Sequence, residues 1–192
     1  IKKFPNELNN KILLIPSLLR KEFYSLKIIE DTIENINLLI IGGSQGAKLF
    51  DTVIGESIIN LSKKYKLKIF HQTSLKNYDN LSNFYLCNNI ENELFDFSED
   101  IFSFMNKSNI SISRAGASTL AELIYLEIPH IAIPLPSAKD NHQFENAFFY
   151  DQLGCNWILN QNEISSKKLT DKLVNIIENK EEYLIKKKNM ES

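Results

Sequence analysis

The chain has 192 residues, 43% of them hydrophobic, which is enough for the core of one domain with room for a short appendage. Its 22 Lys and Arg and 24 Asp and Glu give a formal net charge of −2, which argues against bulk binding of nucleic acid. The two cysteines, Cys87 and Cys155, lie far apart without a Cys/His cluster, so neither a disulfide framework nor a metal site is expected and a reducing cytoplasm fits best.

The apolar runs are short, well below the roughly 20 residues that a membrane-spanning helix needs. No charged amino-terminal region with a cleavage site opens the chain. The chain begins at Ile1 without Met and ends in a Lys-rich helical pattern. We therefore expect a piece of a longer protein.

Residues 1–35 mix Pro, Asn and Lys with a brief apolar run, which predicts a linker or the end of a missing amino-terminal domain. From residue 36 to residue 192 we expect one domain, in which short apolar runs alternate with helical patterns. Strands are predicted at 36–41, 67–71, 109–113, 129–133 and 155–159, with two more short runs at 84–87 and 93–97. Helices are predicted at about 46–64, 75–82, 99–107, 117–126, 141–152 and from 164 onward.

This alternation predicts a doubly wound α/β domain with a parallel sheet covered on both faces. The helix at 141–152 is expected to pack Phe148 and Phe149 against the sheet. In open sheets of this kind, ligands bind beyond the carboxyl ends of the strands. The loops that follow 36–41, 109–113 and 129–133 are therefore the candidate sites.

The first loop, "GGSQGA", brings Gly43, Ser44 and Gln45 directly after a buried strand. Its spacing fits neither the dinucleotide fingerprint nor the phosphate loop of nucleotide hydrolases. The glycines allow a close approach of the backbone to a ligand, and amides at a helix start favour an anion. A tight turn that holds no ligand explains the same residues equally well.

The second loop, "SRAGASTLAEL", opens a helix at Ala117, Ser118 and Thr119, whose backbone N–H groups suit a diphosphate. Glu122 follows within the next turn and could accept hydrogen bonds from a pair of sugar hydroxyls. The alternative is a capping box, since Thr119 and Glu122 have the S/T-x-x-E spacing. Spacing alone favours the capping box.

The third loop, "PLPSAKDNHQFENA", is dense in polar groups that suit a ligand rich in hydroxyls, among them Asp140, His142, Gln143 and Asn146. A solvated helix start is the alternative, and the position of His142 alone does not make it a general base. Together, two glycine-bearing anion sites and one polyhydroxyl-reading loop at one sheet edge indicate a nucleotide-sugar site.

Four motifs follow one another along the chain: "GGSQGA", "HQT" at 71–73, "SRAGASTLAE" and "IPLPSAKDNHQFENA". In their order and spacing, they resemble the carboxyl-terminal half of the MurG family of peptidoglycan glycosyltransferases. The resemblance covers residues 36–192. It implies the Rossmann-like carboxyl-terminal domain of a GT-B glycosyltransferase, which binds UDP-N-acetylglucosamine.

The resemblance also implies a role for each site residue. Ser44, with Gly43 and Gln45, would meet the donor near its diphosphate. Ala117 to Glu122 would form one binding segment, with phosphate at the first three amides and ribose at the Glu122 carboxylate. Gln143 would bind the transferred sugar beside His142, Asp140 and Asn146. The backbone at Ser98 would read the uracil, and Arg20 falls at a donor-binding arginine of the family, in a segment that lacks the family's Gly-Asn. The remaining binding residues on this account are Leu120 and Ala121.

The reaction implied is an inverting transfer of N-acetylglucosamine to a lipid-linked muramoyl-pentapeptide, without metal or cofactor. The family's amino-terminal domain is absent from these residues, and it would supply the general base, the acceptor site and the contact with the inner face of the bacterial plasma membrane. The chain is therefore expected to bind donor, to be catalytically incomplete, and to act in the cytoplasm as part of a peripheral membrane protein. Two alternatives stay open: another GT-B transferase with a different UDP-sugar, and the donor-binding subunit of a split transferase.

Overall fold

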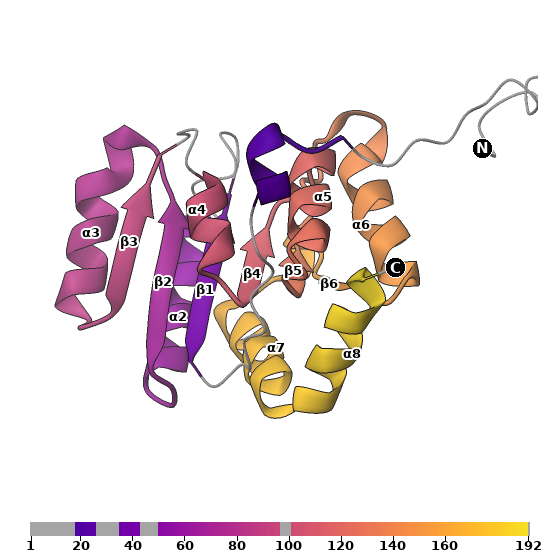
Figure 1. The fold of residues 1–192 in the computed structure, drawn as a ribbon. Coiled ribbons are helices and arrows are strands. Elements are labelled where there is room, and N and C mark those ends of the chain that lie inside the picture. Colours follow the sequence, from indigo (N-terminus) through magenta and orange to yellow (C-terminus); the bar gives the residue numbers. More distant parts are fainter. Residues whose placement is uncertain (1–17, 26–34, 43–49, 97–100, 192) are drawn as a thin grey trace, which may run out of the picture.

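The computed structural model describes residues 18–25, 35–42, 50–96 and 101–191. Within them, six parallel strands form one sheet in the order β3-β2-β1-β4-β5-β6 (Figure 1). The strands are β1 (Ile36–Ile41), β2 (Leu67–Gln72), β3 (Glu91–Phe95), β4 (Ile110–Ser113), β5 (His130–Ala132) and β6 (Asn156–Ile158). The strand order reverses between β1 and β4, and the doubly wound α/β prediction is confirmed.

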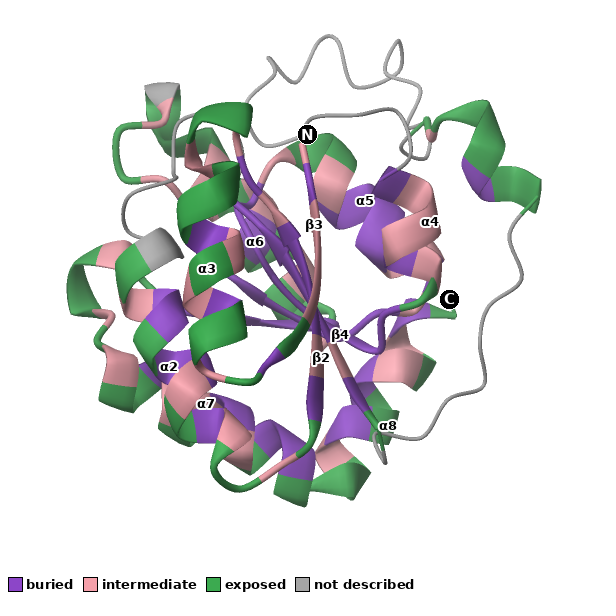
Figure 2. Ribbon diagram, turned by 90° about the vertical axis from the view of Figure 1, so that its left-hand side faces the viewer, coloured by how far each residue is buried: buried purple, intermediate pink, exposed green. Residues whose placement is uncertain are grey.

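Helices cover both faces of the sheet (Figure 2). The first face carries α2 (Gly55–Ser62), α3 (Tyr78–Cys87) and α7 (Ser166–Glu178), and the second carries α4 (Ile101–Asn106), α5 (Ala117–Tyr125) and α6 (His142–Gln152). Short helical turns are η2 (Lys21–Ser25), η3 (Phe50–Ile54), η4 (Leu75–Asn77), η5 (Lys139–Asn141) and η6 (Gln161–Glu163). Leu38 and Ile40 of β1 face the first layer and Leu39 and Ile41 face the second, so this strand is buried on both sides.

The carboxyl-terminal helix α8 (Lys180–Met190) lies at the amino ends of the strands. The Tyr183 hydroxyl donates to the carbonyl of Asn109, just before β4, at 2.7 Å. Lys186 is buried, and its Nζ donates to the carbonyl of Asn156, the first residue of β6, at 2.7 Å. These bonds hold α8 at the edge opposite the candidate site.

Some predicted elements differ from the structure. The helix predicted from 164 onward is two helices, because Asn179 has non-helical φ −91° and ψ 71° and its side chain caps α8 by accepting from the Glu182 N–H. The run at 84–87 belongs to α3, and the run at 93–97 corresponds to β3. The first residues of the helix predicted at 46–64 lie outside the described residues.

The expectation that Phe148 and Phe149 pack against the sheet is wrong. These side chains are 42% and 60% exposed, whereas Ala147 is fully buried in a cluster with Ala115, Leu120 and Ala132. The helix α6 is therefore seated on the sheet by a small residue. Its aromatic rings pair with one another on the outside, as in the stacked Phe144 and Phe148 rings.

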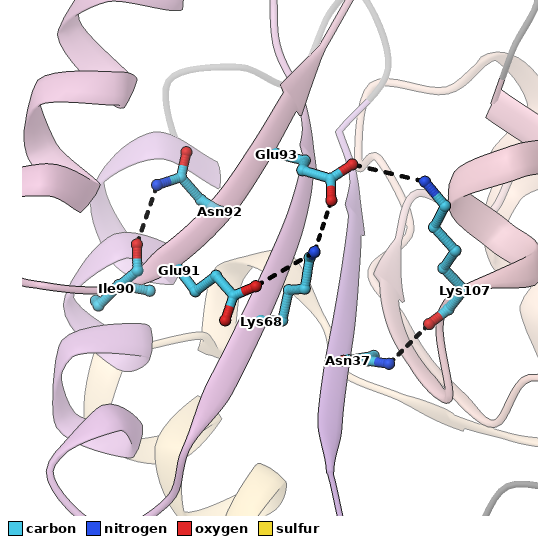
Figure 3. Close-up of polar contacts among 7 residues, drawn as sticks. All are labelled: Asn37, Lys68, Ile90, Glu91, Asn92, Glu93 and Lys107. Atoms are coloured by element: carbon cyan, nitrogen blue, oxygen red, sulfur yellow. Dashed lines mark hydrogen bonds and ion pairs between the residues drawn. The ribbon is translucent and has the colours of Figure 1, made fainter.

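Edge strand β3 carries a network of charged side chains (Figure 3). Lys68 Nζ lies 2.7 Å from Glu93 Oε1 and 3.3 Å from Glu91 Oε1, and Lys107 Nζ lies 3.7 Å from Glu93 Oε2. Partly exposed pairs of this kind contribute at most about 1 kcal/mol each. Charges along an edge strand discourage pairing with another chain, so we interpret this network as structural.

Two fully buried histidines lie in the sheet. His71 Nδ1 is 2.8 Å from the Tyr85 hydroxyl oxygen, and His130 Nδ1 is 2.9 Å from the Ile128 carbonyl oxygen. Burial lowers the pKa of His71 to about 3 and that of His130 to about 4. Both side chains are therefore neutral in the folded chain at neutral pH.

These shifts predict an acid-sensitive fold. Both folded pKa values lie below that of an unfolded histidine, so stability is complete above the unfolded value and is lost as the pH falls. Between about pH 7 and pH 5.5, each histidine should lower the free energy of unfolding by about 1.2 kcal/mol, taking an unfolded pKa of about 6.5. Urea unfolding at the two pH values measures the loss. His71→Gln should remove about half of it, and an undiminished loss in that variant would contradict the assignment.

Candidate functional site

The candidate site lies at the point where the strand order reverses. The Arg114 N–H donates to the Ile41 carbonyl at 3.0 Å and the Ile133 N–H donates to the Ser113 carbonyl at 2.8 Å, so the ends of β1, β4 and β5 are aligned. In doubly wound sheets the crevice at such a reversal is where ligands bind. Gly43, Ser44 and Gln45 follow β1 at this point, but they lie outside the described residues, as does Ser98.

Helix α5 begins at this crevice with unsatisfied backbone donors. Its N-cap is Gly116, at φ −67° and ψ 138°, and no side chain caps it. The first hydrogen bond within the helix joins the Leu120 N–H to the Gly116 carbonyl at 3.0 Å. The N–H groups of Ala117, Ser118 and Thr119 thus have no carbonyl partner within the helix, and the helix dipole adds partial positive charge there. This is an anion-binding geometry.

The capping box that spacing alone favours is wrong. Thr119 lies in the first turn of α5, three residues after the N-cap, and cannot itself be the cap. Glu122 does not fold back toward Thr119. Its Oε1 instead accepts a hydrogen bond from Arg20 Nε at 3.0 Å.

Glu122 is a buried carboxylate within two turns of the free helix start. It is only 5% exposed, and burial raises its pKa, an effect that the hydrogen bond and charge of Arg20 partly offset. A carboxylate has about four lone-pair positions, so it can accept further hydrogen bonds besides the one from Arg20. The arrangement suits a vicinal pair of hydroxyls next to a bound phosphate.

The third loop is tied to the second. Asn146 Nδ2 donates to the Ala115 carbonyl at 3.1 Å, and Gln143 Oε1 accepts from the Leu135 N–H at 3.0 Å. Gln143 therefore has its amide NH₂ group left to offer a ligand, and Asn146 has its amide oxygen. Asp140 has a left-handed backbone, with φ 52°, and His142 is an exposed residue at the start of α6.

Two of the expected binding residues, Leu120 and Ala121, have buried side chains. Leu120 packs in the cluster beneath α5 and α6, and its N–H is already used within the helix. The Leu120 side chain thus faces the core, and the expected part of these two residues in donor binding stays a prediction.

Comparison with known proteins identifies the domain. The model of the glycosyltransferase family 28 C-terminal domain matches residues 37–192. This chain belongs to that family. Together with the relative described next, the match confirms the resemblance to the carboxyl-terminal half of MurG that the loop motifs indicated.

Among curated relatives of this family 28 domain, the UDP-N-acetylglucosamine--N-acetylmuramyl-(pentapeptide) pyrophosphoryl-undecaprenol N-acetylglucosamine transferase of Pelagibacter ubique (strain HTCC1062) is 58% identical over 190 residues. The alignment covers 99% of this chain and 53% of the relative. The chain therefore spans about half the length of the curated relatives it matches.

Solved structures share the fold. The crystal structure of Acinetobacter baumannii MurG matches with a TM-score of 0.73 at 24% identity, over 97% of this chain and 53% of that chain. The solution structure of ALG13 matches with a TM-score of 0.54 at 19% identity, over 77% of this chain and 88% of that chain. The six-stranded parallel sheet is thus the carboxyl-terminal domain fold of GT-B glycosyltransferases.

Two features of the chain are not among the predictions from its sequence. Arg114 is buried directly after β4, its Nη1 donates to the Ile133 carbonyl at 3.2 Å, and burial lowers its pKa to about 10. This hydrogen bond joins the end of β4 to the end of β5, just before the third loop begins. The other feature is the packing of residues 18–25 on α5, for which the spacing of Leu19 and Phe23, one helical turn apart, is the available signal.

An open pocket of about 410 Å³ between the end of β6 and α7 is the alternative candidate to the start of α5 for binding an anion. Lys168 and Lys172 line it, but Lys168 pairs with Glu163 at 3.0 Å and Lys172 Nζ lies 5.3 Å from the Trp157 ring centroid. Acidic Glu163 and Asp171 line the same pocket. The free amides of α5 are therefore better suited to a diphosphate.

Proposed function

We propose that this chain is the donor-binding half of an inverting glycosyltransferase that moves N-acetylglucosamine from UDP-N-acetylglucosamine to a lipid-linked muramoyl-pentapeptide in peptidoglycan synthesis. The family match and the printed activity of the Pelagibacter ubique relative support this assignment. The observation that carries it is the buried Glu122 carboxylate beside the free amino end of α5, at the reversal of the strand order.

In this proposal each group of the site contacts one part of the donor. The diphosphate lies on the amides of Ala117, Ser118 and Thr119, with Gly43, Ser44 and Gln45 on its other side. The ribose hydroxyls donate to Glu122. The proposed contacts with the transferred sugar come from Gln143, His142, Asp140 and Asn146. The proposed contact with the uracil is the backbone at Ser98. Arg20 acts beside Glu122.

The chemistry follows from these contacts. An acceptor hydroxyl gives its proton to a general base, which the amino-terminal half would supply, and its oxygen attacks the anomeric carbon. The bond from that carbon to the UDP oxygen breaks, UDP leaves with the bonding electrons, and the configuration inverts. Negative charge grows on the departing diphosphate, and preorganised donors aimed at growing charge lower a barrier. The amides at the start of α5 are such donors, since they need not reorient during the reaction.

The acceptor side belongs to the other half of the protein in this proposal. Residues 1–35 are the linker to it, residues 36–192 are the UDP-sugar domain, and the chain alone binds donor without transferring it. Among the described residues, each helix is too short or too polar to span a lipid bilayer. The proposed place of action is the cytoplasmic face of the plasma membrane, reached through the amino-terminal half.

Isothermal titration of the chain with UDP-N-acetylglucosamine, UDP-glucose and UMP tests the proposal. We expect the order of affinity UDP-N-acetylglucosamine, then UDP-glucose, then UMP, because each step removes groups that the third loop or the α5 amides contact. Tighter binding of UDP-glucose would favour a transferase with another donor. Equal weak binding of all three, or no binding, would contradict the assignment.

A further inference from the structure

The segment of residues 18–25, here called the clasp, precedes the family 28 match and packs on α5 (Figure 1, indigo helix). Phe23 is fully buried in the hydrophobic cluster that also contains Leu123 and Leu126 at the end of α5. The Tyr24 ring meets the Tyr125 ring edge-on, with centroids 5.6 Å apart. The clasp therefore has its own apolar anchors on this helix.

The clasp also carries the charge that meets Glu122. Arg20 and Tyr24 are four residues apart, and their partners Glu122 and Tyr125 are three apart on one face of α5. The guanidinium of Arg20 lies over the Phe23 ring, 5.1 Å from its centroid, so the buried ring supports the arginine. Arg20 thus lies between the Phe23 ring, which supports its guanidinium, and the Glu122 carboxylate, which accepts its hydrogen bond.

This contact has consequences for the carboxylate. A carboxylate that is nearly buried favours its neutral form, and a hydrogen-bonded cation opposes that tendency. Arg20 Nε donates a hydrogen bond to Glu122 Oε1. This bond orients the carboxylate and leaves Glu122 Oε2 for a second partner. In the described part of the chain, Arg20 is the charged side chain that lies against Glu122.

We propose that Arg20 is a positioning residue, which keeps Glu122 charged and oriented for the ribose hydroxyls and so makes recognition of the nucleoside depend on the clasp. This inference rests on the proposed function. It differs from a direct contact of Arg20 with the donor, because here the effect of Arg20 passes through Glu122. The clasp couples the segment before the domain to the ribose subsite.

A double-mutant cycle with two ligands tests the inference. Affinities for UDP and for 2′,3′-dideoxyuridine diphosphate, which lacks both ribose hydroxyls, are measured for the wild-type chain, R20A, E122Q and the double variant. We expect R20A to bind UDP about tenfold more weakly, the loss of roughly one charge-assisted hydrogen bond. It should bind the dideoxy ligand like the wild type, and it should add little to E122Q.

Two further readouts separate positioning from general damage. Lys21→Ala, an exposed neighbour on the same turn, should bind UDP like the wild type, and R20K should lie between the wild type and R20A. The acidic limit of UDP-N-acetylglucosamine binding should move to higher pH in R20A, because Glu122 loses the group that holds its pKa down. Thermal melting of each variant checks that the fold is kept, as expected for an arginine side chain 44% exposed.

Equal losses of affinity for the two ligands, or a full R20A effect in the E122Q background, would overturn the inference and establish a direct contact. Those outcomes would leave the proposed function standing. Failure of the wild-type chain to bind UDP or UDP-N-acetylglucosamine would instead overturn the proposed function, and the inference with it.

Discussion

Ser118→Asp should weaken the binding of UDP by several hundredfold while leaving the affinity for uridine nearly unchanged. Ser118 is an exposed residue at the free start of α5. A carboxylate there would occupy the proposed position of the diphosphate. Two unit charges about 4 Å apart repel by about 4 kcal/mol at an effective dielectric constant near 20, which is more than enough for that loss.

The same substitution should not harm the fold. An acidic residue in the first turn of a helix interacts favourably with the dipole, by about 0.3–1 kcal/mol. Binding and stability should therefore change in opposite directions, which no general damage to the domain would produce. Ser118→Asn is the matched control of similar size and should keep most of the affinity. Unchanged UDP binding by S118D in isothermal titration would remove α5 from the diphosphate site.

Glu122→Ala should weaken the binding of UDP-N-acetylglucosamine by about a hundredfold, equivalent to about 2.7 kcal/mol and to two hydrogen bonds that involve a charged group. Stability should change little, because burial already disfavours the ionised carboxylate and its partner Arg20 keeps access to water. The loss of stability in E122A should therefore be smaller than the loss caused by breaking a fully buried ion pair.

Calorimetric titration gives the affinity, and chemical denaturation gives the stability. Glu181→Gln serves as the control for charge, since Glu181 is exposed on α8 at the opposite edge of the sheet. Loss of binding in both variants would point to net charge rather than to the ribose contact. Full affinity in E122A would show that the donor does not use this carboxylate.

Buried parallel strands were the most predictable part of the fold. The strand predicted at 36–41 matches β1 residue for residue, because a strand covered on both faces needs apolar side chains in both directions, as in Leu38 to Ile41. Helix ends and faces were harder. Asn179 breaks the last helix by capping the next one, and α6 rests on Ala147 although Phe148 and Phe149 have the larger apolar surface. Both outcomes depend on neighbours that are distant in sequence.

The candidate site was predictable where it depends on local geometry. The loop after the strand at 109–113 predicted a helix start at Ala117 to Thr119 with free amides, and α5 begins at Ala117. The role of Glu122 was not decidable from spacing, because its partner Arg20 is 102 residues away. The third loop is likewise fixed by a long-range bond, from Asn146 to the Ala115 carbonyl. Tertiary contacts, rather than motif spacing, decide what these side chains do.

In the proposed function, a UDP-sugar binds across the free start of α5 at the reversal of the strand order. The most direct test follows the backbone amide resonances of the isotope-labelled chain by NMR during a titration with UDP. We expect the largest shifts at Ala117, Ser118 and Thr119, with smaller ones near Gln143. Shifts confined to the pocket around Lys168 and Lys172, or to the α8 edge, would contradict it.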